Sequence, residues 1–320
     1  MPLLSGSSFR PACGLGNGHV QTIWPVLFRR LPNITNQRER LDLPDGDFLD
    51  LDWARHEVIP HVRRRLVILT HGLESSSCDV SIQGMAAAFY EAGWDVLAWN
   101  MRGCSGEPNR LPRFYHSGET RDLAAVIDHV STSYDEVGLI GFSLGGNIIL
   151  KYLAEPNIAP SITGAVTFSV PCDLASSVDR LDAPDGRIYT RRFIRSLRAK
   201  IHEKKRHFPA EFDVTRLETM RTFHEFDSAY TAPLHGFSSA EDYWRRASCL
   251  PVLGRIRVRT LLVSAINDPF LSPACLPFAA ARESDFLHLE TPASGGHCGF
   301  ISSRCPTVGW PETRALEFLG

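Results

Sequence analysis

The sequence predicts an α/β protein built on a doubly wound, mostly parallel β-sheet with an inserted helical lid. Short runs rich in Val, Ile and Leu alternate with segments whose apolar residues recur at helical spacing, beginning near residue 47. Such runs are typical of strands buried on both faces, and their alternation with helices is typical of parallel crossover units. We therefore expect the functional side chains at the carboxyl ends of the strands, where sheets of this kind bind their ligands.

The expected elements follow one another without internal repeats. The first strand, residues 48–53, alternates apolar and polar side chains, as an antiparallel strand with one solvated face would. The remaining elements, in chain order, are a strand at 65–71, a helix through Met85, Ala88 and Phe89, a strand at 94–99, a helix at about 118–134, a strand at 137–140, a helix containing Ile148, Ile149, Tyr152 and Leu153, strands at 162–170 and 257–265, a helix at 271–281, a strand at 286–290 and a helix from Glu312.

Two segments interrupt this alternation. Residues 1–45 are expected to form an irregular N-terminal arm, because the glycine-rich stretch 14–19 lacks the strand that precedes a dinucleotide-binding loop. Four apolar side chains are expected to dock this arm onto the core: Trp24, Leu27, Phe28 and Leu31. Residues from about 173 to 250, dense in charged and aromatic side chains, are expected to form the lid. Without a flexible linker, 1–320 is predicted to be a single domain.

Composition and charge narrow the expected partners and location. The 320 residues are 43% hydrophobic and 22% charged, with a formal net charge of -2, so nucleic acid is not an expected partner. The eight cysteines form no C-x-x-C pair, and neither a signal peptide nor an apolar run of about 18 residues is present. We therefore expect a cytoplasmic protein without a transmembrane segment. No metal-ligand spacing occurs among the histidines and cysteines, and no metal or cofactor is expected.

The stretch Gly141-Phe142-Ser143-Leu144-Gly145 joins an expected strand to an expected helix. The pattern G-x-S-x-G in this context is typical of a sharp turn that presents a nucleophilic serine. The serine is expected at positive φ, with glycine needed two residues before and after it because these positions are crowded. Since such a short pattern also arises by chance in a chain with 24 glycines, the prediction depends on partners for Ser143.

A serine hydroxyl needs a base that takes its proton and an acid that orients the base. Asp268 and His297 each follow the end of an expected strand, in a loop. We predict that Ser143 is the nucleophile, His297 the base and Asp268 the acid. Asp173, which also follows a strand, is the alternative acid.

Acyl transfer also requires hydrogen-bond donors aimed at the developing oxyanion. The backbone amide of Leu144, directly after the serine, is one predicted donor, and the amide of Leu73 is the other. Gly72 is expected to let the backbone approach the substrate. His71 is interpreted as a side chain that organises this loop rather than as a second base.

These motifs resemble those of the YheT-like α/β-hydrolases, a branch that includes the mammalian lung-type abhydrolases and fungal ethyl-ester-forming acyltransferases. The resemblance covers nearly the whole chain and is carried by residues 18–25, 71–74, 100–109, 115–120, 141–147, 226–237, 267–270 and 295–300. It implies the α/β-hydrolase fold and places the family's triad on Ser143, Asp268 and His297, in the chain order of that fold. Eukaryotic relatives usually carry an N-terminal membrane anchor that this sequence lacks, so we expect a soluble, bacterial-type protein.

The predicted function is a serine hydrolase that cleaves carboxylic esters with short- to medium-chain acyl groups through an acyl-enzyme intermediate. Ester hydrolysis is what the resemblance implies, with phospholipid cleavage or alcohol acyl transfer in some members. An alcohol O-acyltransferase and a phospholipase-type lipid hydrolase are therefore alternatives. A non-catalytic binding protein that keeps the hydrolase fold is the alternative of another class.

The expected lid offers two surfaces for a small ester or lipid-like substrate. Its aromatic side chains can line an acyl pocket or simply pack: Phe223, Phe226, Tyr230, Phe237, Tyr243 and Trp244. Phe193, Ile194, Leu197 and Ile201 form an apolar helical stripe, and the rest of that helix is basic, with Arg191, Arg192, Arg195, Arg198, Lys200, Lys204, Lys205 and Arg206. The basic face can contact anionic lipid headgroups, although an amphipathic helix with a solvated face is the simpler interpretation.

Overall fold

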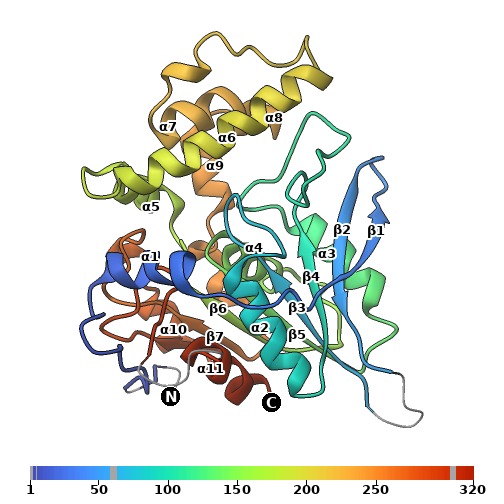
Figure 1. Cartoon of the computed structure of the whole chain (residues 1–320), viewed down its shortest axis with the longest axis vertical. Coiled ribbons are helices and arrows are strands. Elements are labelled where there is room, and N and C mark those ends of the chain that lie inside the picture. Colours follow the sequence, from blue (N-terminus) through green and yellow to red (C-terminus); the bar gives the residue numbers. More distant parts are fainter. Residues whose placement is uncertain (1–2, 5, 58–62, 303–307) are drawn as a thin grey trace.

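An eight-stranded sheet with the order β1-β2-β4-β3-β5-β6-β7-β8 forms the centre of the computed structural model (Figure 1). The structure describes residues 3–4, 6–57, 63–302 and 308–320. Strand β2 pairs antiparallel with β1 and β4, and the other neighbouring strands pair in parallel. The mostly parallel sheet expected from the sequence is confirmed. The strands are β1 (Gln37–Asp42), β2 (Phe48–Ala54), β3 (Arg65–Thr70), β4 (Asp95–Asn100), β5 (Glu136–Phe142), β6 (Ile162–Phe168), β7 (Thr260–Val263) and β8 (Leu287–Glu290).

Strand β2 was expected to have one solvated face, and this expectation is wrong because all of its residues are buried. The carboxylate of Asp52 accepts a hydrogen bond from Arg38 (2.7 Å), and that of Asp50 accepts one from Arg40 (2.8 Å). Both arginines lie directly across the antiparallel ladder on β1. Their side chains cover the polar face of β2 and compensate its buried charges.

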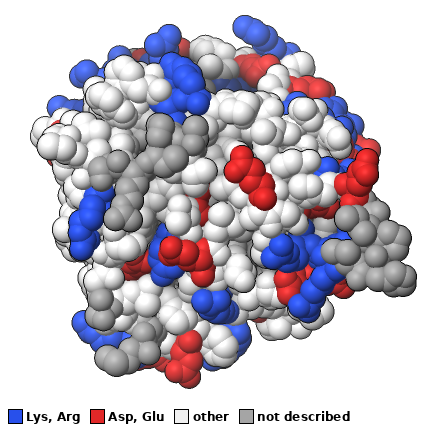
Figure 2. Space-filling model, turned by 60° about the horizontal axis from the view of Figure 1, so that its bottom comes forward, with Lys and Arg blue, Asp and Glu red and all other residues white. Residues whose placement is uncertain are grey.

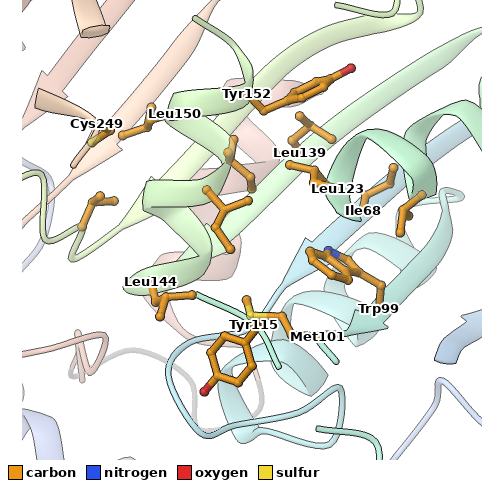
Figure 3. Close-up of a cluster of buried hydrophobic side chains, with 14 of the residues drawn as sticks. Ile68, Trp99, Met101, Tyr115, Leu123, Leu139, Leu144, Leu150, Tyr152 and Cys249 are labelled. Atoms are coloured by element: carbon orange, nitrogen blue, oxygen red, sulfur yellow. The ribbon is translucent and has the colours of Figure 1, made fainter. Parts of the chain in front are cut away.

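Helices cover both faces of the sheet, as a doubly wound fold requires. One face carries α3 (Thr120–Val130), α4 (Leu144–Tyr152) and α10 (Phe278–Glu283), and the other carries α2 (Val80–Glu91) and α11 (Trp310–Leu319). Figure 3 shows the first layer, in which Ile68, Trp99 and Leu139 of the sheet lie near Leu123 of α3, and Leu150 of α4 lies beside Cys249. This packing anchors α4, the helix that follows the predicted nucleophile.

The helix expected at 271–281 is instead a 3₁₀ turn, Pro273–Cys275, followed by the short helix α10. Pro273 starts the turn and Pro277 immediately precedes α10. Because proline lacks a backbone N–H and disfavours a helical residue before it, the two prolines divide the segment.

Between β6 and β7 the chain forms a group of helices at one end of the molecule (Figure 1). These helices are α5 (Leu174–Asp182), α6 (Arg187–His207), α7 (Phe223–Phe226), α8 (Ala232–Leu234) and α9 (Ala240–Ala247), with a π-helical turn at Asp227–Thr231 and 3₁₀ turns at Leu217–Thr219 and Leu250–Arg255. We call residues 173–250 the inserted segment. Its role as a lid stays a prediction.

The N-terminal arm is more regular than expected, because residues Gly18–Phe28 form helix α1. Asn17 caps this helix by accepting hydrogen bonds from the amides of His19 and Val20. Trp24, Leu27 and Phe28, which were expected to dock the arm, are 42%, 52% and 60% exposed. That expectation is wrong, and the buried side of α1 is formed by other residues. Within the described residues, no helix is long and apolar enough to cross a membrane.

Candidate active site

Ser143 lies at the apex of the turn between β5 and α4, with φ 52° and ψ −119°. The crowding expected around it is present. A Cβ atom on Gly141 would lie 2.7 Å from the amide nitrogen of Gly146, and one on Gly145 would overlap the carbonyl oxygens of Thr70 and His71. Only glycine fits at these two positions, so the local sequence holds Ser143 in its strained conformation.

Asp268 and His297 come together in the loops after β7 and β8. The Nδ1 atom of His297 lies 2.9 Å from Oδ2 of Asp268, and only 9% and 1% of the two side chains are exposed. Oδ1 of Asp268 also accepts a hydrogen bond from the amide of Phe270 (2.9 Å). The carboxylate is therefore held in place at the imidazole. Asp173, the alternative acid, instead precedes α5 as its N-cap residue.

The ring of His297 stacks on that of Phe270, with centroids 3.9 Å apart and planes 16° from parallel. Burial alone would lower the pKa of His297, but the carboxylate of Asp268 outweighs burial and raises this pKa above its usual value. The stacking and the ion pair together restrict the imidazole to one orientation.

The two amides predicted as oxyanion donors are next to Ser143. Leu144 begins α4, and a Cβ atom on Gly72 would lie 3.5 Å from the Cβ atom of Ser143, which places the loop containing Leu73 beside the serine. Within the described chain, neither the Leu73 nor the Leu144 amide has a hydrogen-bond acceptor. Two free N–H groups next to the serine can donate hydrogen bonds to an oxygen atom on which negative charge develops.

His71 organises this loop, as expected. Its Nε2 atom accepts a hydrogen bond from the amide of Met101 (3.1 Å), so Nδ1 carries the proton and donates to the carbonyl of Gly72 (2.8 Å). Burial lowers the pKa of His71 to about 4, which keeps the ring neutral. Because the Gly72 carbonyl and the Leu73 N–H belong to one planar peptide, His71 also sets the direction of the Leu73 N–H.

Helix α1 holds the loop that carries His297, a role that was not predicted for it. The hydroxyl of Thr22 accepts a hydrogen bond from the amide of His297 (2.9 Å). The side chain of Gln21, which is fully buried, accepts from the amide of Ile301 (2.6 Å) and donates to its carbonyl (3.2 Å). Both residues lie within the stretch 18–25 that carried part of the family resemblance, which was the one signal that pointed to them.

Two hollows meet at Ser143. The inner cavity lies beneath the inserted segment, and the outer groove lies between α1, the loop after β3 and α6. Both are lined by Leu73, Ser143, Phe193, Phe270 and His297. The walls of the inner cavity are mainly apolar and include Leu174, Val178, Leu181, Leu197, Phe223 and Trp244.

The carboxylate of Asp227 is an acidic group among the mainly apolar walls of the inner cavity. Asp227 accepts hydrogen bonds from Thr231 (2.6 Å) and from the indole of Trp244 (2.8 Å). Burial raises the pKa of Asp227 to about 6. Of the six aromatic residues considered for an acyl pocket, Phe223, Tyr243 and Trp244 line this cavity.

Glu74, directly after the oxyanion loop, joins that loop to α6. Its carboxylate accepts hydrogen bonds from Ser196 (2.7 Å) and Tyr115 (2.7 Å) and lies 2.9 Å from the ammonium of Lys200. Lys200 also contacts Sγ of Cys104 (3.4 Å). These partners keep the pKa of Glu74 below its ordinary value despite burial. The inserted segment and the predicted oxyanion loop are thus joined by a buried ion pair.

The basic face expected on α6 is therefore smaller than the sequence indicated. Lys200 is largely buried against Glu74, and Lys204 is buried and donates to the carbonyl of Asn109 (2.9 Å). Arg198 donates to the carbonyl of Met220. Only part of the positive charge on this helix is available to a partner.

His116, Glu119 and His235 form a group that is compact enough to hold a metal ion. Glu119, however, already pairs with Arg113 (3.2 Å), and Nδ1 of His116 accepts a hydrogen bond from the amide of Gly118 (3.1 Å). A proton on Nε2 of His116 then faces Glu119 at 3.4 Å. Two of the three side chains are thus engaged in internal contacts, whereas Nε2 of His235 is buried and has no hydrogen-bond partner within the described residues.

Comparisons with known proteins identify the family and the fold of the chain. A family model described as alpha/beta hydrolase fold matches residues 65–303. YheT of Escherichia coli K12, which bears the name of an esterase, is 34% identical over 98% of this chain and 94% of its own length. Human phospholipase ABHD3 is 25% identical, over 93% of this chain and 75% of its own length.

Solved structures share the fold at low identity. The Pyrococcus furiosus esterase Pf2001 superposes with a TM-score of 0.57 at 17% identity, covering 91% of this chain and 95% of its own. A bacterial membrane phospholipase A superposes with a TM-score of 0.56 at 15% identity, covering 94% and 89%. The α/β-hydrolase fold expected from the sequence is confirmed, and the chain belongs to the YheT-like α/β-hydrolases.

Proposed function

We propose that this protein is a serine hydrolase that cleaves carboxylic esters of short- to medium-chain acids, with Ser143 as nucleophile, His297 as base and Asp268 as the acid that orients His297. The observation that carries the proposal is the buried ion pair of His297 and Asp268 at a cavity that Ser143 also lines. The names of the relatives, among them an esterase and a phospholipase, support esters or lipids as the substrate class.

In the proposed reaction, His297 accepts the hydroxyl proton of Ser143 while the serine oxygen bonds to the ester carbonyl carbon. The carbonyl oxygen becomes an oxyanion, which accepts hydrogen bonds from the backbone N–H groups of Leu73 and Leu144. His297 then gives the proton to the departing alkoxide as the carbon–oxygen bond breaks, which leaves an acyl-enzyme. Water, deprotonated by His297, attacks the acyl carbon, and release of the acid restores the serine.

The two hollows suggest where the halves of the ester bind. The apolar walls of the inner cavity suit the acyl chain, and the outer groove leaves room for the alcohol portion. Since water or a second alcohol would reach the acyl-enzyme through the same groove, alcohol acyl transfer is the alternative outcome of the same chemistry.

A fluorophosphonate probe tests the proposal directly. We expect the probe to label the wild-type protein on Ser143 and to leave Ser143→Ala unlabelled. Equal labelling of the two proteins, or none of either, would contradict the assignment and favour a binding protein that keeps the fold.

A series of nitrophenyl esters of increasing chain length then measures the acyl preference, which we expect to peak at short to medium chains. The same reactions in dilute ethanol distinguish hydrolysis from acyl transfer, because a product pool dominated by the ethyl ester would identify an acyltransferase. The cytoplasmic location stays a prediction that cell fractionation can test.

A further inference from the structure

Large apolar side chains are exposed mainly at one place on the described surface. Six large hydrophobic residues are exposed on the described surface. Four of them, Trp24, Val26, Leu27 and Phe28, lie within one stretch of α1, and Ile188 lies in the first turn of α6. The rings of Trp24 and Phe28 pack against each other, with centroids 4.4 Å apart. A cluster of exposed apolar residues of this kind usually marks an interaction surface.

The first half of α6 presents a basic face. Its exposed residues recur at helical spacing and so lie on one side of the helix: Arg187, Ile188, Arg191, Arg192 and Arg195. Within the described part of the chain, none of these four guanidinium groups has a carboxylate partner. On the face shown in Figure 2, by contrast, basic and acidic groups are interspersed. Four unpaired like charges on one face favour an anionic partner.

The apolar and basic groups lie on opposite sides of the outer groove. Val26 and Leu27 line its α1 side, and Tyr189 and Arg192 line its α6 side. The two helices are joined there by a hydrogen bond between Nδ1 of His19 and the hydroxyl of Tyr189 (2.9 Å). Because the same groove reaches Ser143, a partner bound across both helices would cover the access route to the serine.

We propose that this rim surface, formed by Trp24, Leu27 and Phe28 of α1 and by Arg187, Ile188, Arg191, Arg192 and Arg195 of α6, docks on an anionic lipid surface. Tryptophan, phenylalanine and leucine side chains partition into the headgroup region, and arginines beside them pair with lipid phosphates. Docking does not depend on the proposed function. The further inference that esters carried by the lipid surface enter through the outer groove rests on the proposed function.

Other occupants match the surface less well. A second copy of the chain related by two-fold symmetry would bring the same four arginines together, and like charges repel. A nucleic acid would neutralise the arginines but leave Leu27 and Phe28 in water. An anionic lipid surface satisfies both parts of the rim.

Vesicle co-sedimentation tests the proposal. One set of vesicles contains phosphatidylcholine alone, and the other contains about 30% phosphatidylglycerol, whose negative surface potential attracts basic residues. We expect wild type to bind the anionic vesicles at least tenfold more tightly than the neutral ones. Arg191→Gln/Arg195→Gln should lose at least tenfold in affinity, since each arginine contributes roughly fivefold. Trp24→Ser/Phe28→Ser should lose binding to both vesicle types.

Arg255→Gln/Arg282→Gln is the matched control, because it removes two exposed charges from another part of the surface. The control should bind like wild type. Equal weakening of the control and the rim variant would show non-specific attraction and overturn the proposal. Heparin retention that depends on the rim arginines without vesicle binding would overturn it in favour of a nucleic acid, and a dimer that Trp24→Ser/Phe28→Ser converts to monomer would overturn it in favour of self-association.

Two activity assays separate docking from catalysis. A soluble nitrophenyl ester should be hydrolysed equally by wild type and both rim variants, whereas the same chromophore on a long-chain ester within anionic vesicles should be hydrolysed at least tenfold more slowly by the variants. Ser143→Ala should bind vesicles like wild type. If wild type hydrolyses neither ester, the proposed function fails, and the vesicle binding of these proteins still decides the docking proposal.

Discussion

The imidazole of His297 and the carboxylate of Asp268 form an ion pair of 2.9 Å that is almost excluded from solvent. The carboxylate raises the pKa of His297 above its usual value. Since a general base must be neutral, the activity of the wild type should be lost as the pH falls through this raised pKa.

Asp268→Asn should therefore lower kcat by about 10³–10⁴-fold and move the acidic limb of the kcat/KM profile to lower pH. The profile is measured with a soluble nitrophenyl ester. Asp173→Asn, at the alternative acid, should leave the limb in place. An unchanged limb in Asp268→Asn would show that Asp268 does not set the protonation of His297.

Thr22→Val should lower kcat by about ten- to a hundredfold with little change in KM, because the amide of His297 loses the hydroxyl that positions it. Thr22→Ser keeps an acceptor and should restore most of the rate. Steady-state kinetics of both variants decide the matter. If the valine and serine variants are equally slow, packing of the methyl group rather than the hydrogen bond is responsible.

His71 makes a pH-dependent contribution to stability. Burial lowers its pKa to about 4 in the folded chain, so between roughly pH 6.5 and 4 the unfolded chain binds a proton that the folded chain does not. The free energy of unfolding should fall by about 3 kcal/mol from this residue as the pH drops through that window. Urea titrations of wild type and His71→Gln measure the difference, and parallel stability curves would contradict it.

The ion pair between Glu74 and Lys200 should matter for stability as well as for the oxyanion loop. Lys200→Met leaves the buried carboxylate of Glu74 without its cation and should lower the free energy of unfolding by about 3–5 kcal/mol. Glu74→Gln/Lys200→Met removes both charges and should lose less. If urea titration gives Lys200→Met a free energy of unfolding within about 1 kcal/mol of wild type, the hydrogen bonds from Ser196 and Tyr115 are sufficient to stabilise the buried carboxylate of Glu74.

Gly145→Ala should destabilise the chain by more than about 3 kcal/mol, because the added methyl group overlaps the carbonyl oxygens of Thr70 and His71. Gly254→Ala is the matched control, since a Cβ atom at Gly254 meets nothing within 4 Å. Thermal unfolding and soluble yield give the comparison. An active Gly145→Ala protein with an unchanged unfolding midpoint would refute the packing argument.

Much of the sheet and the positions of the three proposed catalytic side chains were accessible from the sequence because their signals are local. A buried parallel strand is a continuous apolar run, and the loops that follow such strands share one edge of the sheet. Gly141 and Gly145 are required because a side chain at either position would clash with the backbone close to the turn around Ser143. These features need no knowledge of distant contacts.

The remaining features depend on partners far away in the chain. Lys200 was expected to be solvated because lysines usually are, and its burial depends on Glu74, which a sequence pattern does not pair with it. Gln21 and Thr22 are ordinary polar residues until the loop after β8 reaches them. Likewise, the identity of Trp24 and Phe28 did not reveal which side of α1 faces the core.

The contact between α1 and the His297 loop joins the two ends of the chain, since Thr22 and His297 are 275 positions apart in sequence. During synthesis the arm leaves the ribosome long before its binding site exists, and such distant pairing closes late in folding. A nascent chain can therefore contain the finished turn around Ser143 while His297, the proposed base, is still unanchored. Under the proposed function, the catalytic group would then be complete only after the loop that carries His297 has been synthesised and has bound α1.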